Sequence, residues 1–275
     1  MNNFEAYKMD GLGNDFVIFD NREKSISLTK NQVVKISNRN NIGCDQIIFI
    51  DKDKSSNAFL KFYNSDGGEI SACGNGSRCV AYLLMKENNN KKISLRTKVG
   101  ILQAELNDQN SVSINMGQPN FEWDKIPLSK KMDNRNLKIV INSTYGKEVV
   151  GGFSLSVGNP HVVFFVEDFN QFNLKEIGPK IENHNYFPEK CNVTLANIKN
   201  RKLIKAKVWE RGAGLTKACG TAACATAVSG AVLNLSDRRV DIEFSEGLLS
   251  VDWKRDNNIH MMGKVSEIKK ITVNI

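Results

Sequence analysis

The 275-residue sequence lacks several patterns that would assign a function at once. No two cysteines form a C-x-x-C pair and the three histidines are isolated, so neither a zinc site nor a dithiol redox motif is expected. Nucleotide-binding loops of the G-x-G-x-x-G or G-x-x-x-x-G-K-[ST] type are absent. The net charge is +8, but Lys and Arg occur in pairs and never in runs of five or more. This excess is interpreted as solvated surface, and no nucleic-acid partner is expected.

Targeting and membrane segments are also missing. The first residues contain no apolar h-region, so no signal peptide is predicted. Residues 218–235 contain no charge, but Ala, Thr, Ser, Gly and Asn dominate them. Such a stretch indicates a helix buried in protein rather than in lipid, so no membrane association is expected. With no export signal, reduced thiols in a cytoplasm are the expectation.

One short segment occurs twice. Residues 72–75 (Ala-Cys-Gly-Asn) and 218–221 (Ala-Cys-Gly-Thr) each precede a stretch with the composition of a helix. Cys73 and Cys219 are 146 positions apart (219 minus 73), about half of the chain. This spacing indicates two similar halves, each with one thiol at a helix start. The unpaired N–H groups there are expected to lower the pKa of a thiol from about 8.5 into the range of about 3.5–7.5.

The remaining pattern is rich in strands. Helices are predicted at 29–40 with Thr29 as N-cap, at about 76–86, at 174–183 with an interruption at Gly178-Pro179, and after Cys219. Strands are predicted at 16–20, 47–50, 59–63, 93–97, 101–106, 111–116, 137–142, 152–157, 161–166, 192–198, 204–209, 240–244, 248–253 and 259–263. Residues 117–136 are polar and are interpreted as a linker. Each half therefore has many strands and one uncharged helix, which a sheet curled around that helix would cover.

The cysteine segments and several other short motifs resemble the diaminopimelate epimerase family. The motifs follow the family's order and span residues 11 to 224, so the resemblance covers essentially the whole chain. A single A-C-G would be weak, but the set together is very specific. The motifs are Gly11-Leu12-Gly13-Asn14-Asp15-Phe16, Asp45-Gln46, Asn64-x-Asp66-Gly67, Ala72-Cys73-Gly74-Asn75-Gly76-x-Arg78-Cys79, Gly158-Asn159-Pro160-His161, Asn192-Val193, Glu210-Arg211-Gly212-Ala213-Gly214 and Ala218-Cys219-Gly220-Thr221.

The resemblance implies an α/β (α+β) fold of two domains related by a pseudo-two-fold axis. Each would be a curled, mostly antiparallel β-sheet around a central helix. The expected domains are residues 1–117, joined by the returning residues 264–275, with Cys73, and residues 118–263 with Cys219. The family further implies a cytoplasmic homodimer that uses no metal, pyridoxal or other cofactor.

The implied activity is an isomerase that interconverts LL- and meso-2,6-diaminopimelate in bacterial lysine and peptidoglycan precursor biosynthesis. In the family one cysteine thiolate removes the α-proton and the other cysteine, as a thiol, delivers a proton to the opposite face. The residue chemistry agrees, because inversion at carbon needs a base on one face and an acid on the other. Two thiols suit these roles if one is ionised and the pair titrates as a unit. The other four cysteines are interpreted as buried structural thiols.

The resemblance also implies a substrate site. Arg211 would offer a fork to the distal carboxylate, and Glu210 would pair with an ammonium group. The amides of the helix starts would bind the reacting α-carboxylate and stabilise its developing charge. His161 is expected to set the environment of a cysteine, with a structural role equally open. The implied substrate-binding residues are Asn14, Gln46, Asn64, Gly74, Asn75, Asn159, Asn192, Glu210, Arg211, Gly220 and Thr221.

Two other interpretations remain open at this point. The nearest is another cofactor-free two-thiol racemase, acting on proline or hydroxyproline, although Arg211 and three asparagines suit a second amino-acid head better than a small ring. A thiol redox or nucleic-acid-binding module would need the patterns that are absent. The chain departs from the family at Asp10, often His, at Cys44, commonly apolar, and at Leu215, frequently Glu. None of these three positions is assigned to the chemistry.

Overall fold

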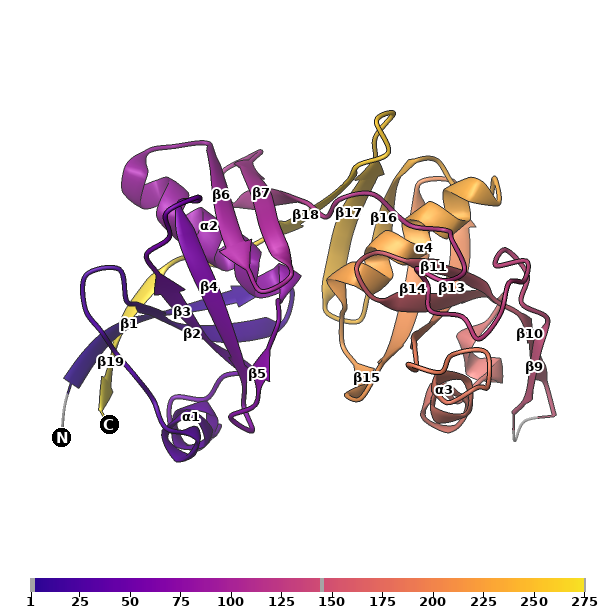
Figure 1. Ribbon diagram of the computed structural model, residues 1–275, viewed down its shortest axis with the longest axis horizontal. Helices are drawn as coiled ribbons and strands as arrows, with labels where there is room; N and C mark the ends of the chain where they lie inside the picture. Colours follow the sequence, from indigo (N-terminus) through magenta and orange to yellow (C-terminus); the bar gives the residue numbers. More distant parts are fainter. Residues whose placement is uncertain (1–2, 144–145, 275) are drawn as a thin grey trace. The chain divides into compact units, whose positions relative to one another are not determined.

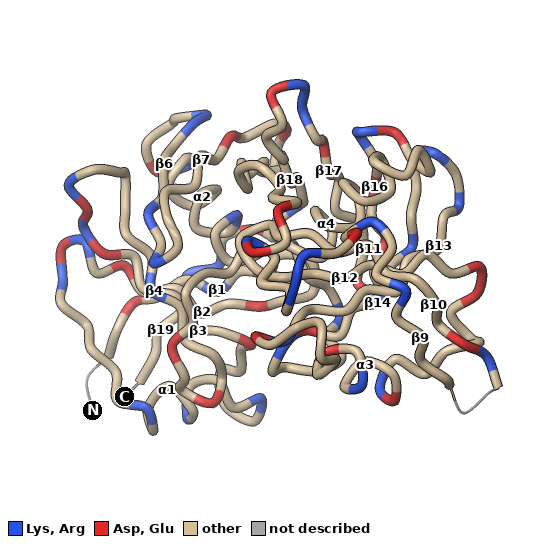
Figure 2. The backbone as a smooth tube through the Cα atoms, turned by 45° about the vertical axis from the view of Figure 1, so that its right-hand side comes forward, with Lys and Arg blue, Asp and Glu red and all other residues tan. Residues whose placement is uncertain are grey.

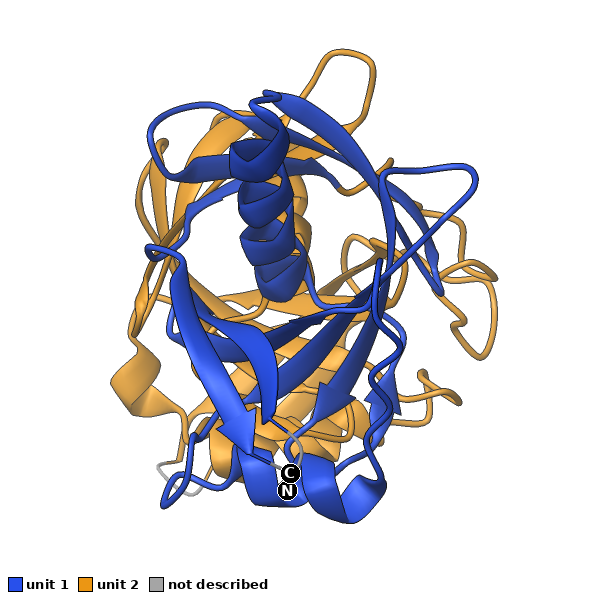
Figure 3. Ribbon diagram, turned by 90° about the vertical axis from the view of Figure 1, so that its left-hand side faces the viewer, with its two compact units in different colours: residues 1–115, 262–275 blue, residues 116–261 orange. Residues whose placement is uncertain are grey.

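The computed structural model of the chain describes residues 3–143 and 146–274 (Figure 1). It divides into two compact units, coloured separately in Figure 3. Unit 1 comprises Met1–Asn115 and Met262–Ile275, and unit 2 comprises Met116–Met261. Lys and Arg, and Asp and Glu, are scattered along the drawn chain (Figure 2). No described helix is both long enough and apolar enough to cross a membrane.

Unit 1 is a curved sheet with two helices. Antiparallel neighbours are β19–β1, β1–β2, β3–β4, β4–β5, β6–β7 and β7–β8, whereas β2–β3 and β4–β6 are parallel. Each parallel pair requires a crossover, and α1 and α2 provide them. The elements are β1 (Asn3–Gly11), β2 (Asn14–Asp20), α1 (Lys30–Ser37), β3 (Gln46–Asp51), β4 (Ala58–Asn64), β5 (Glu69–Ile70), α2 (Gly74–Asn88), β6 (Lys92–Thr97), β7 (Gly100–Leu106), β8 (Ser111–Asn115) and β19 (Lys269–Asn274).

Unit 2 repeats this connectivity. β11–β12, β13–β14, β14–β15 and β16–β17 are antiparallel, whereas β12–β13 and β14–β16 are parallel, with α3 and α4 as the crossovers. The hairpin β9–β10 forms a separate small sheet. The elements are β9 (Ile139–Asn142), β10 (Glu148–Gly151), β11 (Phe153–Ser156), β12 (Pro160–Phe165), the 3-10 turn η1 (Phe169–Gln171), α3 (Leu174–Glu182), β13 (Asn192–Asn200), β14 (Leu203–Glu210), β15 (Gly214–Thr216), α4 (Gly220–Val232), β16 (Arg239–Phe244) and β17 (Gly247–Trp253); β18 (Ile259–Lys264) leads back into unit 1.

Each unit is organised around one buried helix, as the sequence predicts. In unit 1, α2 packs against β1, β2, β6, β7 and β8, and Figure 3 shows it within the curve of the sheet. In unit 2, α4 packs against β11, β12, β13, β16 and β17. The hydroxyls of Thr226 and Ser229 inside α4 donate to carbonyls one turn earlier, at 2.7 and 2.8 Å. These bonds allow an uncharged but partly polar helix to be buried.

The helix boundaries follow from local chemistry. Thr29 caps α1 in a capping box with Gln32, in which the Thr29 N–H donates to Gln32 Oε1 at 2.8 Å. The prediction of Thr29 as N-cap is confirmed, although α1 ends at Ser37 rather than at residue 40. Helix α2 ends where Asn89 adopts the left-handed conformation, with φ of 51°.

Several predictions about the elements are wrong. Helix α3 is not interrupted at Gly178-Pro179, because Pro179 lies inside one continuous helix. The central helix α2 is not uncharged, because it contains the fully buried Arg78. The stretch 117–136 is not a bare linker, since Ile126 and Leu128 are buried in the core of unit 2. Five strands, β1, β5, β10, β15 and β19, were not predicted; of these, β1 is a long strand with a partner on each side.

Candidate functional site

The two repeated cysteines occupy equivalent places in their units. Cys73 is the N-cap of α2 with φ of −143° and ψ of 116°, and Cys219 is the N-cap of α4 with φ of −141° and ψ of 122°. The Cys73 sulfur accepts from the Gly76 N–H at 3.5 Å. The prediction of a thiol at each helix start is therefore confirmed. Each cysteine directly precedes the unpaired N–H groups that a helix presents at its N-terminus, although the Cys219 side chain makes no capping hydrogen bond.

In unit 1 a chain of amide hydrogen bonds runs beside Cys73. Asn75, one of the predicted substrate-binding residues, donates from Nδ2 to Asn14 Oδ1 at 2.7 Å. Asn14 in turn donates to Asp45 Oδ2 at 3.3 Å. Gln46 donates from Nε2 to Asn64 Oδ1 at 3.1 Å, and its own Oε1 is buried without a partner in the described part of the chain. The structure thus joins the predicted residues of unit 1 into two pairs, Asn14 with Asn75 and Gln46 with Asn64.

In unit 2 the corresponding chain reaches the sulfur itself. The Nε2 of His161 lies 3.0 Å from Asn159 Oδ1, and Asn159 Nδ2 donates to Thr221 Oγ1 at 3.4 Å. Thr221 Oγ1 lies 3.4 Å from the Cys219 sulfur. Because Asn159 Oδ1 can only accept, the His161 tautomer with a proton on Nε2 fits this arrangement. Four predicted residues therefore form one connected group.

Burial decides the ionisation of His161. Its ring is fully buried, and desolvation followed by the positive charge of Arg211 lowers its pKa to about 3. The imidazole is therefore neutral at physiological pH and cannot serve as a cation beside the thiol. Its role in the group is that of a fixed hydrogen-bond donor to Asn159.

The distal part of the predicted site lies at the ends of β13 and β14. Asn192 is buried, donates to the Pro160 carbonyl at 2.9 Å and accepts from the Arg211 N–H at 3.0 Å. The Arg211 guanidinium is exposed and donates to the Glu189 carbonyl at 3.1 Å. Glu210 Oε1 accepts from the Thr216 hydroxyl at 2.5 Å. An exposed guanidinium next to a turn is accessible to an anionic ligand.

The predicted residues of the two units correspond through the repeated topology. Asn14 begins β2 and Asn159 directly precedes β12, at a spacing of 145 (159 minus 14). Gln46 and Asn192 begin β3 and β13 at a spacing of 146 (192 minus 46). Phe16 pairs with Gln46 in register as His161 pairs with Asn192. Asn64 and Glu210 end β4 and β14, again 146 apart (210 minus 64). The units therefore place their polar side chains at the same positions and differ in the residue types.

One sequence-based expectation fails at Cys219. A helix start was expected to lower the pKa of the thiol, but the pKa of Cys219 is raised well above its ordinary value. The first cause is burial, because only 7% of the residue is exposed, and the second is the nearby charge of Glu210. Desolvation and a like charge both oppose the thiolate, and together they outweigh the helix start. In this structure Cys219 is a protonated thiol at neutral pH.

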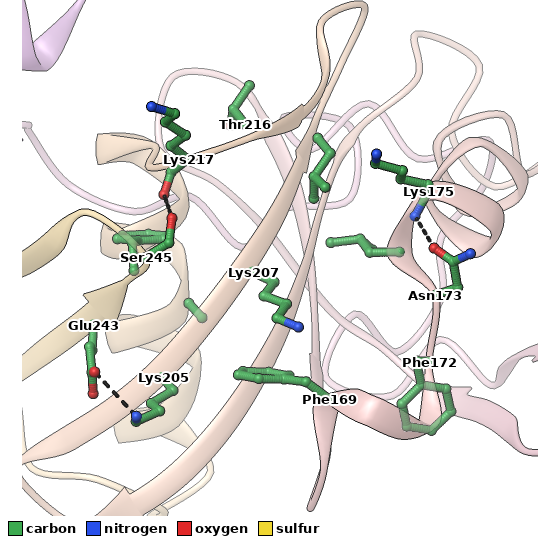
Figure 4. Close-up of a pocket in the computed structure, with 14 residues that line it drawn as sticks. Phe169, Phe172, Asn173, Lys175, Lys205, Lys207, Thr216, Lys217, Glu243 and Ser245 are labelled. Atoms are coloured by element: carbon green, nitrogen blue, oxygen red, sulfur yellow. Dashed lines mark hydrogen bonds and ion pairs between the residues drawn. The ribbon is translucent and has the colours of Figure 1, made fainter. Parts of the chain in front are cut away.

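Other features of unit 2 do not belong to this group. A cavity of about 580 Å³ is lined by Phe169, Lys205 and Lys207 among others, and by none of the predicted site residues (Figure 4). Lys205 pairs with Glu243 at 3.2 Å, and the Lys207 ammonium lies 5.1 Å from the centre of the Phe169 ring. Both of these cations thus already have partners within the protein. Across residues 3–143 and 146–274, His, Cys, Asp and Glu form no cluster of three suited to a metal ion.

The arrangement of elements defines the class of fold. A crystal structure of a PhzF-family phenazine biosynthesis protein from Bacillus anthracis matches with a TM-score of 0.70 at 17% identity, covering 100% of both chains. A hydroxyproline epimerase from Agrobacterium vitis matches with a TM-score of 0.65 at 11% identity, covering 99% of this chain and 93% of that one. At these identities the matches show the fold alone, and they confirm the predicted two-domain α/β architecture.

The sequence comparisons define the family. The family model for diaminopimelate epimerase matches residues 6–122 and 153–268. The diaminopimelate epimerase of Pelagibacter ubique (strain HTCC1062) is 54% identical over 271 residues, which are 98% of this chain and 99% of that protein. The chain therefore belongs to the diaminopimelate epimerase family, a family of isomerases. The resemblance on which the sequence interpretation rested is confirmed, and the thiol redox and nucleic-acid-binding alternatives fall away.

Two residues of the site were missed by the sequence interpretation. Arg78 lies within a quoted motif, but the motif did not indicate that its side chain is fully buried and donates to Asn75 Oδ1 at 2.7 Å. Thr216 was assigned no role, although it donates to Glu210. For Arg78 a signal was present, since a charged residue in an otherwise apolar helix indicates a specific buried partner. Nothing in the sequence around Thr216 distinguishes it from an ordinary strand residue.

Proposed function

We propose that the protein interconverts LL- and meso-2,6-diaminopimelate with two cysteines and no cofactor, as an enzyme of bacterial lysine and peptidoglycan precursor synthesis. The observation on which this proposal chiefly rests is the pair of N-cap cysteines at equivalent places in two units of one topology. Family membership supplies the substrate. The similarity to proline-type racemases is one of fold, because the sequence identity to the diaminopimelate epimerases is far higher.

The proposed reaction is a proton exchange on opposite faces of one carbon. Cys73, as the thiolate, removes the α-proton, and the electron pair of the broken C–H bond passes into the α-carboxylate. Cys219, as the thiol, then gives its proton to the other face of the carbon. The two sulfurs finish with exchanged protonation states, so the reverse reaction starts from the other cysteine. The raised pKa of Cys219 supports its assignment as the acid, because it keeps this thiol protonated before the substrate binds.

Backbone amides are the proposed stabilisers of the intermediate. An α-proton of an amino acid is far less acidic than a thiol, so the negative charge that develops on the carboxylate must be bound by fixed donors. The N–H groups of Gly74 and Asn75 in α2, and of Gly220 and Thr221 in α4, belong to first helical turns whose donors have no intrahelical acceptor. We assign these amides to the reacting carboxylate.

The distal head of the substrate is assigned to the polar residues at strand ends. Arg211 offers a planar fork to the distal carboxylate. Glu210, beside Cys219, pairs with an ammonium group, which would offset the carboxylate's effect on the thiol. Asn14, Gln46, Asn64, Asn159 and Asn192 supply neutral donors and acceptors, which hold a zwitterion without adding charge near the sulfurs.

The test is epimerisation by the purified protein and by two serine variants. Wild type should convert LL-diaminopimelate to the meso form after dialysis against a strong chelator. Cys73→Ser and Cys219→Ser should each lose at least ~10²–10⁴-fold in rate, the usual contribution of a positioned acid or base. Cys224→Ser, a buried thiol of α4 outside the site, is the matched control and should keep its activity. Near wild-type turnover by either serine variant of the pair would contradict the mechanism.

The family resemblance also predicts a homodimer in the cytoplasm. Light scattering of the purified protein should then give about twice the mass of a single chain. A monomeric mass over a wide concentration range would count against the dimer without affecting the proposed reaction.

A further inference from the structure

Arg78 is the unusual residue of the central helix in unit 1. It lies five positions after Cys73 in α2, and its side chain is fully buried. A buried guanidinium is costly unless specific partners receive its hydrogen bonds. One partner is Asn75, whose side-chain oxygen accepts from Arg78 Nη2 at 2.7 Å. The mechanism proposed above gives Arg78 no task.

The hydrogen bonds that start at Arg78 have a fixed direction. A guanidinium can only donate, so the amide oxygen of Asn75 must face it and the amide nitrogen must point away. That nitrogen donates to Asn14 Oδ1 at 2.7 Å, and Asn14 must then turn its own nitrogen outward. Asn14 Nδ2 faces Asp45 Oδ2 at 3.3 Å. This chain of hydrogen bonds therefore begins at the Arg78 guanidinium, which only donates, and ends at the Asp45 carboxylate, which only accepts.

The Asp45 end of these hydrogen bonds is held as firmly as the Arg78 end. Asp45 Oδ2 also accepts from the Asp15 N–H at 3.1 Å, and Asp45 Oδ1 accepts from Arg39. Asp15 in turn accepts from Arg39 at 2.7 Å and from Lys8 at 2.6 Å. With both ends fixed, neither amide between them can rotate by 180° without placing two donors or two acceptors face to face.

Comparison with unit 2 shows that the buried arginine at this helix position is specific to unit 1. The position equivalent to Arg78 at the repeat spacing is Cys224 (78 plus 146), and Thr221 stands where unit 1 has Asn75. The corresponding chain there starts at the neutral His161 and ends at the sulfur of Cys219. The repeat therefore differs in what anchors the polar chain, while the strand positions of Asn14 and Asn159 correspond.

We propose that Arg78 is a positioning residue for substrate binding: it fixes the amide of Asn75 and, through it, the amide of Asn14, so that Asn14 presents its remaining N–H to a substrate carboxylate. This role rests on the proposed function, because it assumes that Asn14 contacts the substrate. Loss of the Arg78 donor allows the Asn75 amide to turn. Its oxygen then faces Asn14 Oδ1, so Asn14 loses the donor that holds it on that side and shifts from the position that a substrate carboxylate needs. Binding therefore weakens although no group that touches the substrate has been changed.

The test is a double-mutant cycle read as KM and kcat for LL-diaminopimelate. Arg78→Met should raise KM about tenfold while kcat changes less, since a binding interaction is lost. Arg78→Lys, which keeps one donor and the charge, should recover part of the loss. Asn14→Ala should raise KM to a similar extent, and adding Arg78→Met to it should cause little further change. Ser77→Ala, the fully buried neighbour in the same helix turn, is the control and should keep the wild-type KM.

The results that would contradict this role differ from the result that would contradict the proposed function. If the effects of Arg78→Met and Asn14→Ala multiply in the double variant, or if Ser77→Ala causes the same loss, Arg78 acts only through the stability of the helix. If Arg78→Met does not fold, Asn75→Ala breaks the same chain at its middle and should show the same lack of additivity with Asn14→Ala; multiplying effects there overturn the role. Wild type without any turnover of LL-diaminopimelate would overturn the proposed function, and this role with it.

Discussion

Cys73 and Cys219 have nearly identical backbone conformations and different surroundings. Their φ and ψ values agree within a few degrees, and each precedes the first turn of a central helix. The repeated A-C-G segment was sufficient to predict this placement, because glycine and small residues after a cysteine allow a helix to start there. It was not sufficient to predict the ionisation of Cys219, because that depends on burial in the fold and on the turn that brings Glu210 back beside the sulfur. The direction of a pKa shift is a property of the folded surroundings.

Replacement of Glu210 should change the reactivity of Cys219. Glu210 is the second cause of its raised pKa, after burial. Glu210→Gln should therefore lower the pKa of Cys219 relative to wild type and speed its alkylation by iodoacetamide at neutral pH, because the thiolate is the reacting form. Peptide mapping after timed alkylation measures the rate. Glu243→Gln, a carboxylate of the same unit paired with Lys205, should leave the rate unchanged. Equal rates in wild type and Glu210→Gln would remove Glu210 as a cause.

His161 should make the stability of the protein sensitive to acid. Its pKa is about 3 in the folded protein and about 6.5 when unfolded. Because the pKa of His161 is lower in the folded protein, its protonation favours the unfolded state. The stability that the neutral imidazole gives the fold is fully present above pH 6.5 and is lost as the pH falls toward 3. When the pH is lowered from 6.5 to 5, one such group decreases the free energy of unfolding by up to about 2 kcal/mol.

The matched variant for this test is His161→Phe, since Phe16 occupies the equivalent register in unit 1. Urea unfolding at pH 6.5 and at pH 5 should show a smaller loss of stability in the variant than in wild type. His184, whose pKa is also lowered by burial, is present in both proteins and cancels in the comparison. The same loss in both proteins would show that His161 does not titrate differently on folding.

At the level of elements, the sequence predicted the central helices and most strands well, and it missed the two terminal strands and three short ones. The apolar central helices and the long inner strands appear because their composition is distinctive. Strand β1 was missed because only Ala6, Met9 and Gly11 of its residues are buried, so its alternation is weak, and because its partner β19 is distant in sequence. The strand β15 is three residues long and exists through pairing with β14.

Helix α3 shows how tertiary packing overrides a local signal. A proline inside a helix removes one backbone bond, so Gly178-Pro179 predicted a break. The helix continues because Leu174, Ile177 and Ile181 are buried in the core of unit 2. Gly178 is required at its position by close approach, since a Cβ there would lie 2.6 Å from Trp209 Cγ.

This contact predicts the effect of Gly178→Ala. Alanine is the better helix former by about 1 kcal/mol, but overpacking against a rigid indole costs about 1–3 kcal/mol. The Trp209 ring is also held by its N–H donating to Glu182 at 2.7 Å, so it cannot shift freely. We therefore expect a net destabilisation in urea unfolding. Lys175→Ala, an exposed substitution in the same helix, should change stability by less than about 0.5 kcal/mol. A more stable Gly178→Ala variant would show that the contact relaxes.

At the scale of the whole chain, the two units share one topology and differ in their side chains. The predicted site residues correspond in pairs, Asn14 with Asn159, Gln46 with Asn192, Asn64 with Glu210 and Cys73 with Cys219. The repeat of the cysteine segment was visible in the sequence. The pairing of the other residues was not, because it requires the strand order and register. Two similar units with unlike polar groups are what an enzyme needs if one thiol is to be a base and the other an acid.

The most direct measurement of the central claim is hydrogen isotope incorporation during epimerisation in heavy water. If one thiolate removes the α-proton and a separate thiol, equilibrated with solvent, delivers to the other face, the first meso-diaminopimelate formed should contain deuterium at the inverted carbon. The unreacted LL substrate recovered at the same early time should remain protiated. Deuterium appearing in recovered substrate as fast as in product, or product that retains the original proton, would contradict a mechanism with two separate cysteines.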